Sequence, residues 1–418
     1  MTASTTGLVR HADPTIRRKV DEFASALTRG DSILVRPKAD YDGIDRVVAT
    51  ISGAAAAATG RLLVTDLESE ELTQTIESVE HPESSAGSTP LFAFHTSGST
   101  GSPKCVIYER PQVISHADAV IATLGLSAAE NYVALPPMRF AYGLSIVVSH
   151  LLAEVPVTFA DAEWGLPALQ AAADDDERPL AVYALPQHTP LLLASDLAPD
   201  RLERLLIAGG RLSGASAQAL ARRFPRMRLT NMYGQAEMGP RLATWHGDPA
   251  DFTEGLIGSP IPGVDLDVAD DGVLLARSDH AMTAAMRAPY EAMEPFAGRN
   301  EAVRTGDRAT RLHSGPHAGL LRHDGRADHV LNVAGTKVDL HRVTAIVQEV
   351  TKPLLVNVGT RPARRGGDLV PVVEIVPNGP APSSTAPVRR ALHTEFGGLA
   401  ALFDLRYVDR LTLKESGK

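Results

Sequence analysis

Apolar runs rich in β-branched and aromatic residues alternate with stretches of helical period over about residues 15–310. Strands that alternate with helices pack as parallel sheets, in which the helices form the crossover connections. This pattern predicts an α/β fold with a large N-terminal domain of parallel sheets and crossover helices. The strand-like runs include residues 32–37, 91–95, 156–161, 180–185 and 204–210, and the helical stretches include residues 111–126 and 214–225.

The pattern changes after about residue 260, where short apolar runs are bounded by Gly, Asp and Pro, as in residues 263–278. Such spacing is typical of antiparallel strands and predicts a small β-rich subdomain. The last ninety residues indicate a compact α+β lobe. Strands are expected there near residues 337–340 and 368–376, and helices near residues 341–350 and 386–396.

Composition excludes several classes of protein. The net charge of −9 and the pI near 5.9 give no basic footprint for nucleic acid. No apolar run reaches the ~18 residues that cross a bilayer. The first twenty residues lack the apolar core of a signal peptide, so a cytoplasmic location is expected. Cys105 is the only cysteine, which excludes an internal disulfide. It lies in a strand-like run, which favours core packing over a nucleophilic role.

A loop of small and hydroxylated residues follows the strand-like run 91–95. It reads Thr-Ser-Gly-Ser-Thr-Gly-Ser-Pro-Lys over residues 96–104. Hydroxyls and backbone amides at this spacing can wrap phosphate oxygens, and Lys104 adds a point charge. The loop lacks the Gly-Lys-Ser/Thr ending of a Walker loop, so a P-loop NTPase is disfavoured. A flexible surface loop is the alternative interpretation.

Further motifs follow this loop in a fixed order. They are "IAGGRLS" at 207–213, "NMYGQAEMG" at 231–239, "RTGD" at 304–307, a segment at 324–343 and "LTLKESGK" at 411–418. With the loop they span about residues 90–418. This order resembles the adenylate-forming superfamily, which contains acyl- and aryl-CoA synthetases, the adenylation domains of peptide synthetases, and luciferases.

The resemblance implies a site for ATP and Mg²⁺. Tyr233 would stack on adenine, Asp307 and Arg326 would hold the ribose, and Glu237 would contact the magnesium. Glu237 as an ordinary carboxylate at a helix start is the alternative. The implied ATP/AMP-binding residues are Thr96, Ser97, Gly98, Ser99, Thr100, Gly101, Lys104, Gly209, Gly210, Asn231, Met232, Tyr233, Gly234, Asp307 and Arg326.

The resemblance also implies a mobile C-terminal lobe. Residues 1–322 would form the N-terminal adenylate-forming domain, residues 323–328 the hinge with Asp328, and residues 329–418 the lid domain. This lobe would carry the catalytic residue Lys418 into the site for adenylation and then rotate to admit an acceptor.

The implied activity is the ATP-dependent activation of a carboxylic acid, with release of pyrophosphate and transfer to a thiol of coenzyme A or of a carrier-protein pantetheine. Two positions depart from the family's pattern. Ala236 replaces a threonine that helps to place phosphate and magnesium, and Asn332 replaces a lysine that serves the second half-reaction. An amine acceptor and a non-catalytic nucleotide-binding regulator therefore remain as alternatives.

The acid pocket is expected at Phe140, Ala141, Tyr142 and Gly143. Ala141 stands where activators of α-amino acids carry an aspartate, and without it an ammonium group would be buried unpaired. An aromatic or medium-chain acid is therefore favoured, although Phe140 and Tyr142 also fit core packing. His313, His317 and His323 lie in Gly/Pro-broken segments, so a zinc site is disfavoured.

Overall fold

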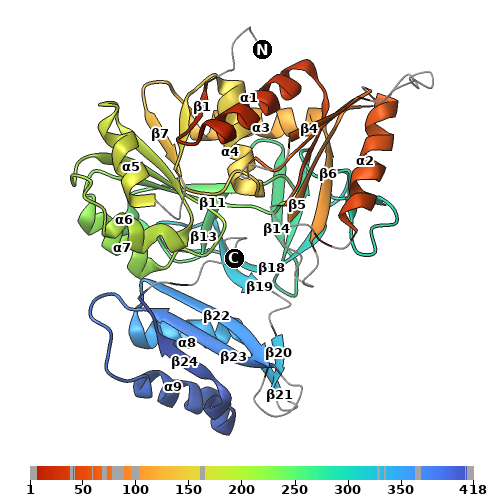
Figure 1. Ribbon diagram of the computed structural model, residues 1–418. Helices are drawn as coiled ribbons and strands as arrows, with labels where there is room; N and C mark the ends of the chain where they lie inside the picture. The colour runs from red at the N-terminus through yellow and green to blue at the C-terminus, as the bar shows by residue number, and fades with distance from the viewer. Residues whose placement is uncertain are drawn as a thin grey trace.

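The computed structural model describes residues 7–37, 41, 43–58, 60–67, 73–77, 89–96, 103–160, 165–326, 330–333, 336–362, 369–409 and 411. Figure 1 shows two mixed sheets with helices in a large body, and a smaller C-terminal lobe drawn in blue below it. The predicted α/β architecture is confirmed.

A twelve-stranded sheet runs through the large body. Its first half is parallel, in the order β1 (Val9–His11), β8 (Val157–Phe159), β7 (Asn131–Ala134), β9 (Leu180–Ala184), β10 (Leu202–Ile207) and β11 (Arg228–Tyr233). Antiparallel strands continue it in the order β12 (Ala243–Gly247), β13 (Leu256–Pro260), β19 (Leu321–Arg326), β18 (Val303–Arg311), β15 (Val273–Ser278) and β14 (Val264–Val268). The predicted β-rich region is thus joined to the parallel strands through β12 and β13.

The second sheet has seven strands and carries the predicted phosphate loop. Strand β2 pairs in parallel with β3 and β5, whereas β5 and β6 form an antiparallel hairpin in which Thr96 lies opposite Lys104. The order is β17 (Glu294–Pro295), β16 (Ala284–Met286), β6 (Lys104–Glu109), β5 (Leu91–Thr96), β2 (Ser32–Val35), β3 (Arg61–Thr65) and β4 (Thr73–Glu77).

Helices α3 and α4 join the two sheets into one core. Phe94 of β5, Val120 of α3, Val147 of α4 and Tyr183 of β9 belong to the same buried cluster, and α4 is buried on nearly every side. A helix that is apolar all round indicates a position inside the protein. The helices of this body are α1 (Pro14–Arg29), α2 (Ile44–Ala58), α3 (Arg110–Leu124), α4 (Ala141–Ala153), α5 (Gly165–Asp174), α6 (Thr189–Leu193) and α7 (Gly214–Arg223).

The C-terminal lobe has its own apolar core, in which Val343, Val373, Leu392 and Phe403 are buried. It contains β20 (Val330–Val333), β21 (Thr336–Asp339), α8 (Leu340–Thr351), β22 (Leu355–Pro362), β23 (Leu369–Val376), α9 (Ala386–Phe396) and β24 (Asp404–Tyr407). These elements include the strands and helices that the sequence predicted for this lobe.

Serine hydroxyls connect the lobe to the large body. The hydroxyl of Ser213, the N-cap residue of α7, donates to the Leu354 carbonyl at 3.0 Å, and Ser216 donates to the same oxygen. Residues 323–326 of the predicted hinge belong to strand β19, and residues 327–328 lie outside the described residues. The predicted domain boundaries therefore stay a prediction.

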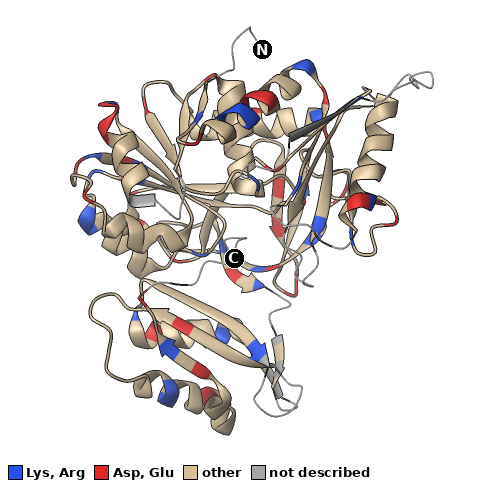
Figure 2. Ribbon diagram, viewed as in Figure 1, with Lys and Arg blue, Asp and Glu red and all other residues tan. Residues whose placement is uncertain are grey.

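Basic and acidic residues are interspersed over both parts of the molecule (Figure 2). Among the described residues, no helix is both long enough and apolar enough to cross a bilayer. Cys105 lies in β6 and is fully buried, and this burial raises the pKa of its thiol.

Candidate active site

The segment Gly234–Gly239 leaves strand β11 and passes the start of strand β6. The Tyr108 hydroxyl donates to the Ala236 carbonyl, and the Gly239 amide donates to the Tyr108 hydroxyl at 3.1 Å. These bonds bring Lys104 and Glu237 together, and the lysine ammonium donates to Glu237 Oε1. The two side chains are 16% and 28% exposed. A cation and a carboxylate thus lie together at the end of the hairpin that carries the predicted phosphate loop.

Gly234 allows this segment to fold back on itself. A Cβ atom at this position would lie 2.0 Å from the Pro240 carbonyl oxygen, which is far inside van der Waals contact. The turn closes with the Leu242 amide donating to the Tyr233 carbonyl at 2.7 Å. The close approach explains why glycine stands at this point of the motif.

Asp307 is the centre of a second polar cluster, formed by the pairing of β18 with β19. Its Oδ2 accepts from the Tyr233 hydroxyl at 2.6 Å and from Gln235 Nε2 at 2.7 Å. Its Oδ1 lies 3.3 Å from Arg326 NH1 and 3.5 Å from His323 Nε2. Four side chains from β11, the following turn and β19 therefore converge on one carboxylate.

The surroundings of Asp307 keep its carboxyl group ionised. Its side chain is only 6% exposed, and this burial acts to raise the pKa. The hydrogen bonds from His323 and Tyr233 and the charge of Arg326 act in the opposite direction and prevail. The pKa of Asp307 is lowered from 3.8 to about 2.

The turn of the 207–213 motif, which holds the predicted ATP/AMP-binding residues Gly209 and Gly210, lies beside this cluster. Gly209 and Gly210 follow strand β10 and are exposed. The next residue, Arg211, donates from NH1 to the His323 carbonyl at 3.2 Å and from Nε to Glu254 at 2.8 Å. Arg211 therefore connects this turn to His323, whose side chain lies against Asp307.

Asn231 and Met232 have a different environment. Both side chains are buried in strand β11, and Asn231 Nδ2 donates to the Leu256 carbonyl at 2.8 Å. These contacts stabilise the packing of β11 beneath the site.

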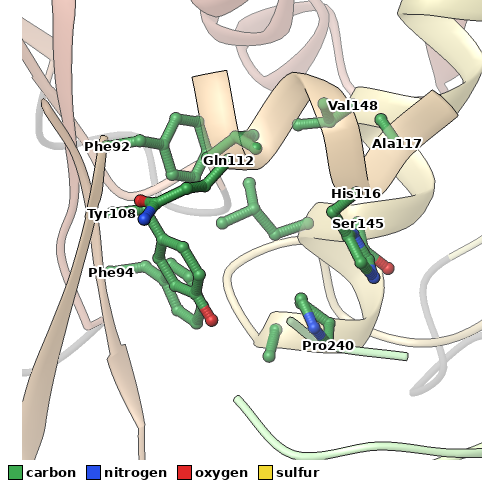
Figure 3. A pocket seen from close by; sticks show the side chains of 12 residues that line it. Phe92, Phe94, Tyr108, Gln112, His116, Ala117, Ser145, Val148 and Pro240 are labelled. Carbon is green, nitrogen blue, oxygen red and sulfur yellow. The ribbon is translucent and has the colours of Figure 1, made fainter. Parts of the chain in front are cut away.

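A small cavity lies between the β5–β6 hairpin and helices α3 and α4 (Figure 3). Phe92, Phe94 and Tyr108 form one wall in the figure, and helix α3 contributes Gln112 and His116. Most of the lining is apolar. The remaining lining residues are Val113, Ala117, Ala141, Leu144, Ser145, Val148 and Pro240.

The predicted acid pocket overlaps this cavity at one residue. Ala141 lines it, at the start of α4. The Tyr142 hydroxyl instead donates to the Leu206 carbonyl at 2.9 Å inside the core, and Gly143 packs against the Pro137 backbone. The Phe140 ring lies under the guanidinium of Arg139 at 4.6 Å. These contacts agree with the packing alternative for Tyr142, and the acid-binding role of the group stays a prediction.

Several predicted site residues lie outside the described residues. These are Ser97, Gly98, Ser99, Thr100 and Gly101 of the phosphate loop, Asp328 of the hinge, and Lys418. Asn332 lies in β20, but its side chain is not described.

Sequence reasoning missed two residues of the Asp307 cluster, Gln235 and His323. Gln235 lies within the 231–239 motif, and the turn that it occupies directs it to Asp307. His323 was considered only as a zinc candidate. The pairing of Asp307 with Arg326 across β18 and β19 brings it to this carboxylate. The sequence signal that could have identified His323 is its position shortly before the Gly-Arg pair of the hinge motif.

Comparison with known proteins decides the family. The family described as AMP-binding enzyme matches residues 26–279, which is more than half of the chain. The chain belongs to the AMP-binding enzyme family. This confirms the adenylate-forming superfamily that the order of motifs predicted.

Relatives of this AMP-binding enzyme differ widely in length. Indigoidine synthase from Dickeya dadantii is 24% identical over 316 residues, which cover 68% of this chain but 21% of the relative. The chain thus spans about a fifth of the length of this curated relative.

Solved structures resemble this AMP-binding enzyme over nearly its whole length. The amide bond synthetase McbA from Marinactinospora thermotolerans has a TM-score of 0.65 at 18% identity and covers 99% of this chain and 96% of its own. The O-succinylbenzoate coenzyme A synthetase from Bacillus subtilis, in complex with AMP, has a TM-score of 0.62 at 16% identity, with 99% and 94% covered. At these identities the likeness concerns the fold.

Proposed function

We propose that this AMP-binding enzyme joins a carboxylic acid to the α-phosphate of ATP, releases pyrophosphate, and passes the acyl group to a thiol. The observation that carries the proposal is the convergence of two sets of groups around one turn. Tyr233 and Gln235 bind Asp307, and Glu237 of the same turn binds Lys104. A nucleotide with its ribose at Asp307 would have its phosphates at the other end of this turn.

The charges fit the reaction. A carboxylate and a triphosphate repel each other, so the site must neutralise charge and hold the attacking oxygen in line with the leaving pyrophosphate. Lys104 is well placed to bind phosphate oxygens once they displace Glu237. Asp307 stays ionised at physiological pH and can accept hydrogen bonds from ribose hydroxyls.

Glu237 fits a magnesium ligand. Mg²⁺ prefers oxygen donors and is commonly bound through one or two carboxylates together with substrate phosphates. The Glu237 side chain is partly exposed and lies against Lys104, the last residue of the predicted phosphate loop. Bound magnesium would supply positive charge to the phosphates, while the carboxylate of Glu237 would hold it there and Lys104 would be released to the nucleotide.

The proposed acid is aromatic or medium-chain rather than an α-amino acid. The cavity that Ala141 lines is bounded mainly by aromatic and aliphatic side chains, which favour an apolar acyl group. The thiol of coenzyme A or of a carrier-protein pantetheine is the proposed acceptor. The structurally similar coenzyme A synthetase supports the thiol by analogy.

The second candidate acceptor is an amine. Asn332 replaces the lysine of the second half-reaction, and the amide bond synthetase of similar fold supports this alternative. In either case we propose that residues 329–418 rotate about the hinge 323–328 between the two half-reactions, with Lys418 serving adenylation.

A two-stage assay tests the proposal. The full chain is given ATP, Mg²⁺ and a panel of aromatic and medium-chain acids, and pyrophosphate release is measured. Acids that respond are then offered coenzyme A, a pantetheinylated carrier protein or amines, and the product mass identifies the acceptor. ATP binding without pyrophosphate release over the whole panel would favour the non-catalytic regulator.

A further inference from the structure

Arg241 has a buried guanidinium that makes no hydrogen bond to the described residues. It follows Pro240 and precedes strand β12, and only 1% of its surface is exposed. Within the described part of the chain, none of its three guanidinium nitrogens has a hydrogen-bond partner. Its backbone amide donates to His116 Nε2 at 3.2 Å, so the main chain is fixed while the charged group is unsatisfied.

Among the residues that the structure describes, the groups around this guanidinium carry no negative charge. It lies 5.4 Å from the centre of the Tyr142 ring and 5.8 Å from that of Tyr183. The Tyr142 hydroxyl donates its hydrogen bond to the Leu206 carbonyl, and the Tyr183 hydroxyl lies 3.0 Å from His150 Nε2. Burial raises the pKa of Tyr183 to about 12, so this phenol is neutral at physiological pH.

The two nearby histidines are also neutral. Burial lowers the pKa of His116 and of His150 to about 3, and the charge of Arg241 contributes to both shifts. Among the described residues, the ion pairs of the structure include none with Arg241. Lys19 is equally buried, but unlike Arg241 it has a counter-charge, because its ammonium group lies 2.8 Å from Asp66 Oδ1.

A buried ion without a counter-charge is costly, because the interior replaces little of the hydration that it loses. The attraction to two ring faces offsets only part of this cost. Such a group is expected where a ligand supplies the missing anion. Arg241 lies behind the lining of the cavity: its chain neighbour Pro240 lines it, as do His116, which binds the Arg241 backbone, and Ala141, the chain neighbour of Tyr142.

We propose that Arg241 binds a second carboxylate of the acid substrate, so that the enzyme activates aromatic or medium-chain acids with two acidic groups. The inference rests on the proposed function. The reacting carboxylate is the less suitable partner, because adenylation removes its charge and would leave Arg241 unpaired again. A second carboxylate keeps its charge throughout the reaction.

Matched acids test the proposal on the full chain. Suberate, its monomethyl ester and octanoate form one series, and terephthalate, its monomethyl ester and benzoate form another. Pyrophosphate release should give kcat/KM values for the diacid about 10- to 100-fold above those of its monoester, because a charge-assisted hydrogen bond is lost in the ester.

Arg241→Met should abolish this preference by lowering the diacid rate while leaving the monoester rate unchanged or higher. Its melting temperature without ligand should be equal to or above that of the wild type, because an unpaired buried charge has been removed. Arg241→Lys, which keeps the charge, should retain part of the preference. Arg204→Met is the control, since Arg204 pairs with Glu130 at 2.8 Å, and it should lower the melting temperature and keep the preference.

Three results would overturn the inference. Equal rates with diacid and monoester in the wild type, with both lost in Arg241→Met, would assign the guanidinium to the reacting carboxylate. A lower melting temperature with an intact diacid preference would assign it a structural role. If no acid releases pyrophosphate, the proposed function fails separately. The melting temperature with and without diacid then still tests the role of Arg241. Stabilisation of the wild type but not of Arg241→Met would support the inference. No stabilisation of the wild type by the diacids would refute it.

Discussion

Replacing Asp307 by asparagine should destabilise the folded protein by an amount that can be worked out from its environment. The carboxyl is 6% exposed and its pKa is lowered from 3.8 to about 2. This lowering of the pKa means that the ionised carboxylate stabilises the folded state relative to the unfolded state by about 2 kcal/mol. Asp307→Asn keeps the shape of the side chain and removes the charge. We therefore expect the free energy of unfolding at pH 7 to fall by about 2 kcal/mol.

The pH dependence separates this electrostatic effect from lost packing. Because the pKa of Asp307 is lower in the folded state, its stabilisation is fully present above the unfolded value of 3.8 and is lost as the pH falls through about 2. The difference between wild type and Asp307→Asn should therefore shrink to about half its neutral value near pH 3. Urea unfolding from pH 7 to pH 3 measures it.

Asp271→Asn is the matched control. Asp271 pairs with Arg304 on the surface, where solvent screens the interaction, so its replacement should leave the unfolding free energy unchanged. A difference for Asp307→Asn that stays constant from pH 7 to pH 3, or that equals the control, would refute the reasoning. ATP binding by the folded variant should also weaken, by about 1.5–3 kcal/mol, if the carboxylate holds the ribose.

The other predictions concern catalysis, the acid pocket and the turn. Lys418→Ala should slow pyrophosphate release by about 10²–10³ and spare transfer from a supplied acyl-adenylate, and equal loss of both steps would contradict the domain rotation. Ala141→Asp should depress activity toward the native acid by burying a carboxylate in an apolar wall, and unchanged kinetics would move the acid pocket elsewhere. Gly234→Ala should lower the melting temperature and the activity together, since its Cβ atom would meet the Pro240 carbonyl at 2.0 Å. A fully stable variant would show that this turn can relax.

The sequence predicted the local elements well, because their signals are local. The apolar alternation located β2, β5, β9 and β10, and the helical period located α3 within two residues at its C-terminal end. The Gly-Arg and Thr-Gly-Asp motifs likewise indicated that Asp307 and Arg326 belong to one site.

The contacts that depend on long-range pairing could not be predicted in the same way. His323 reaches Asp307 because β18 and β19 pair with Asp307 opposite Arg326, and this register is a property of the folded sheet. Arg241 was overlooked for a related reason. An arginine after Gly-Pro reads as a surface residue, since arginine is almost never fully buried unless it is paired. Its burial depends on Tyr142 and Tyr183, which lie far away along the chain.

The serine hydroxyls at the start of α7 have a consequence for the response of the protein to ionic strength. Between the described parts of the C-terminal lobe and of the large body, the hydrogen bonds are those from Ser213 and Ser216 to the carbonyls of Pro353 and Leu354. Uncharged donors and acceptors are little affected by dissolved ions, whereas exposed ion pairs weaken as salt is added. Releasing such bonds costs only about 1–3 kcal/mol in total. These described hydrogen bonds between the lobe and the large body can therefore be broken by thermal motion and are little affected by added salt.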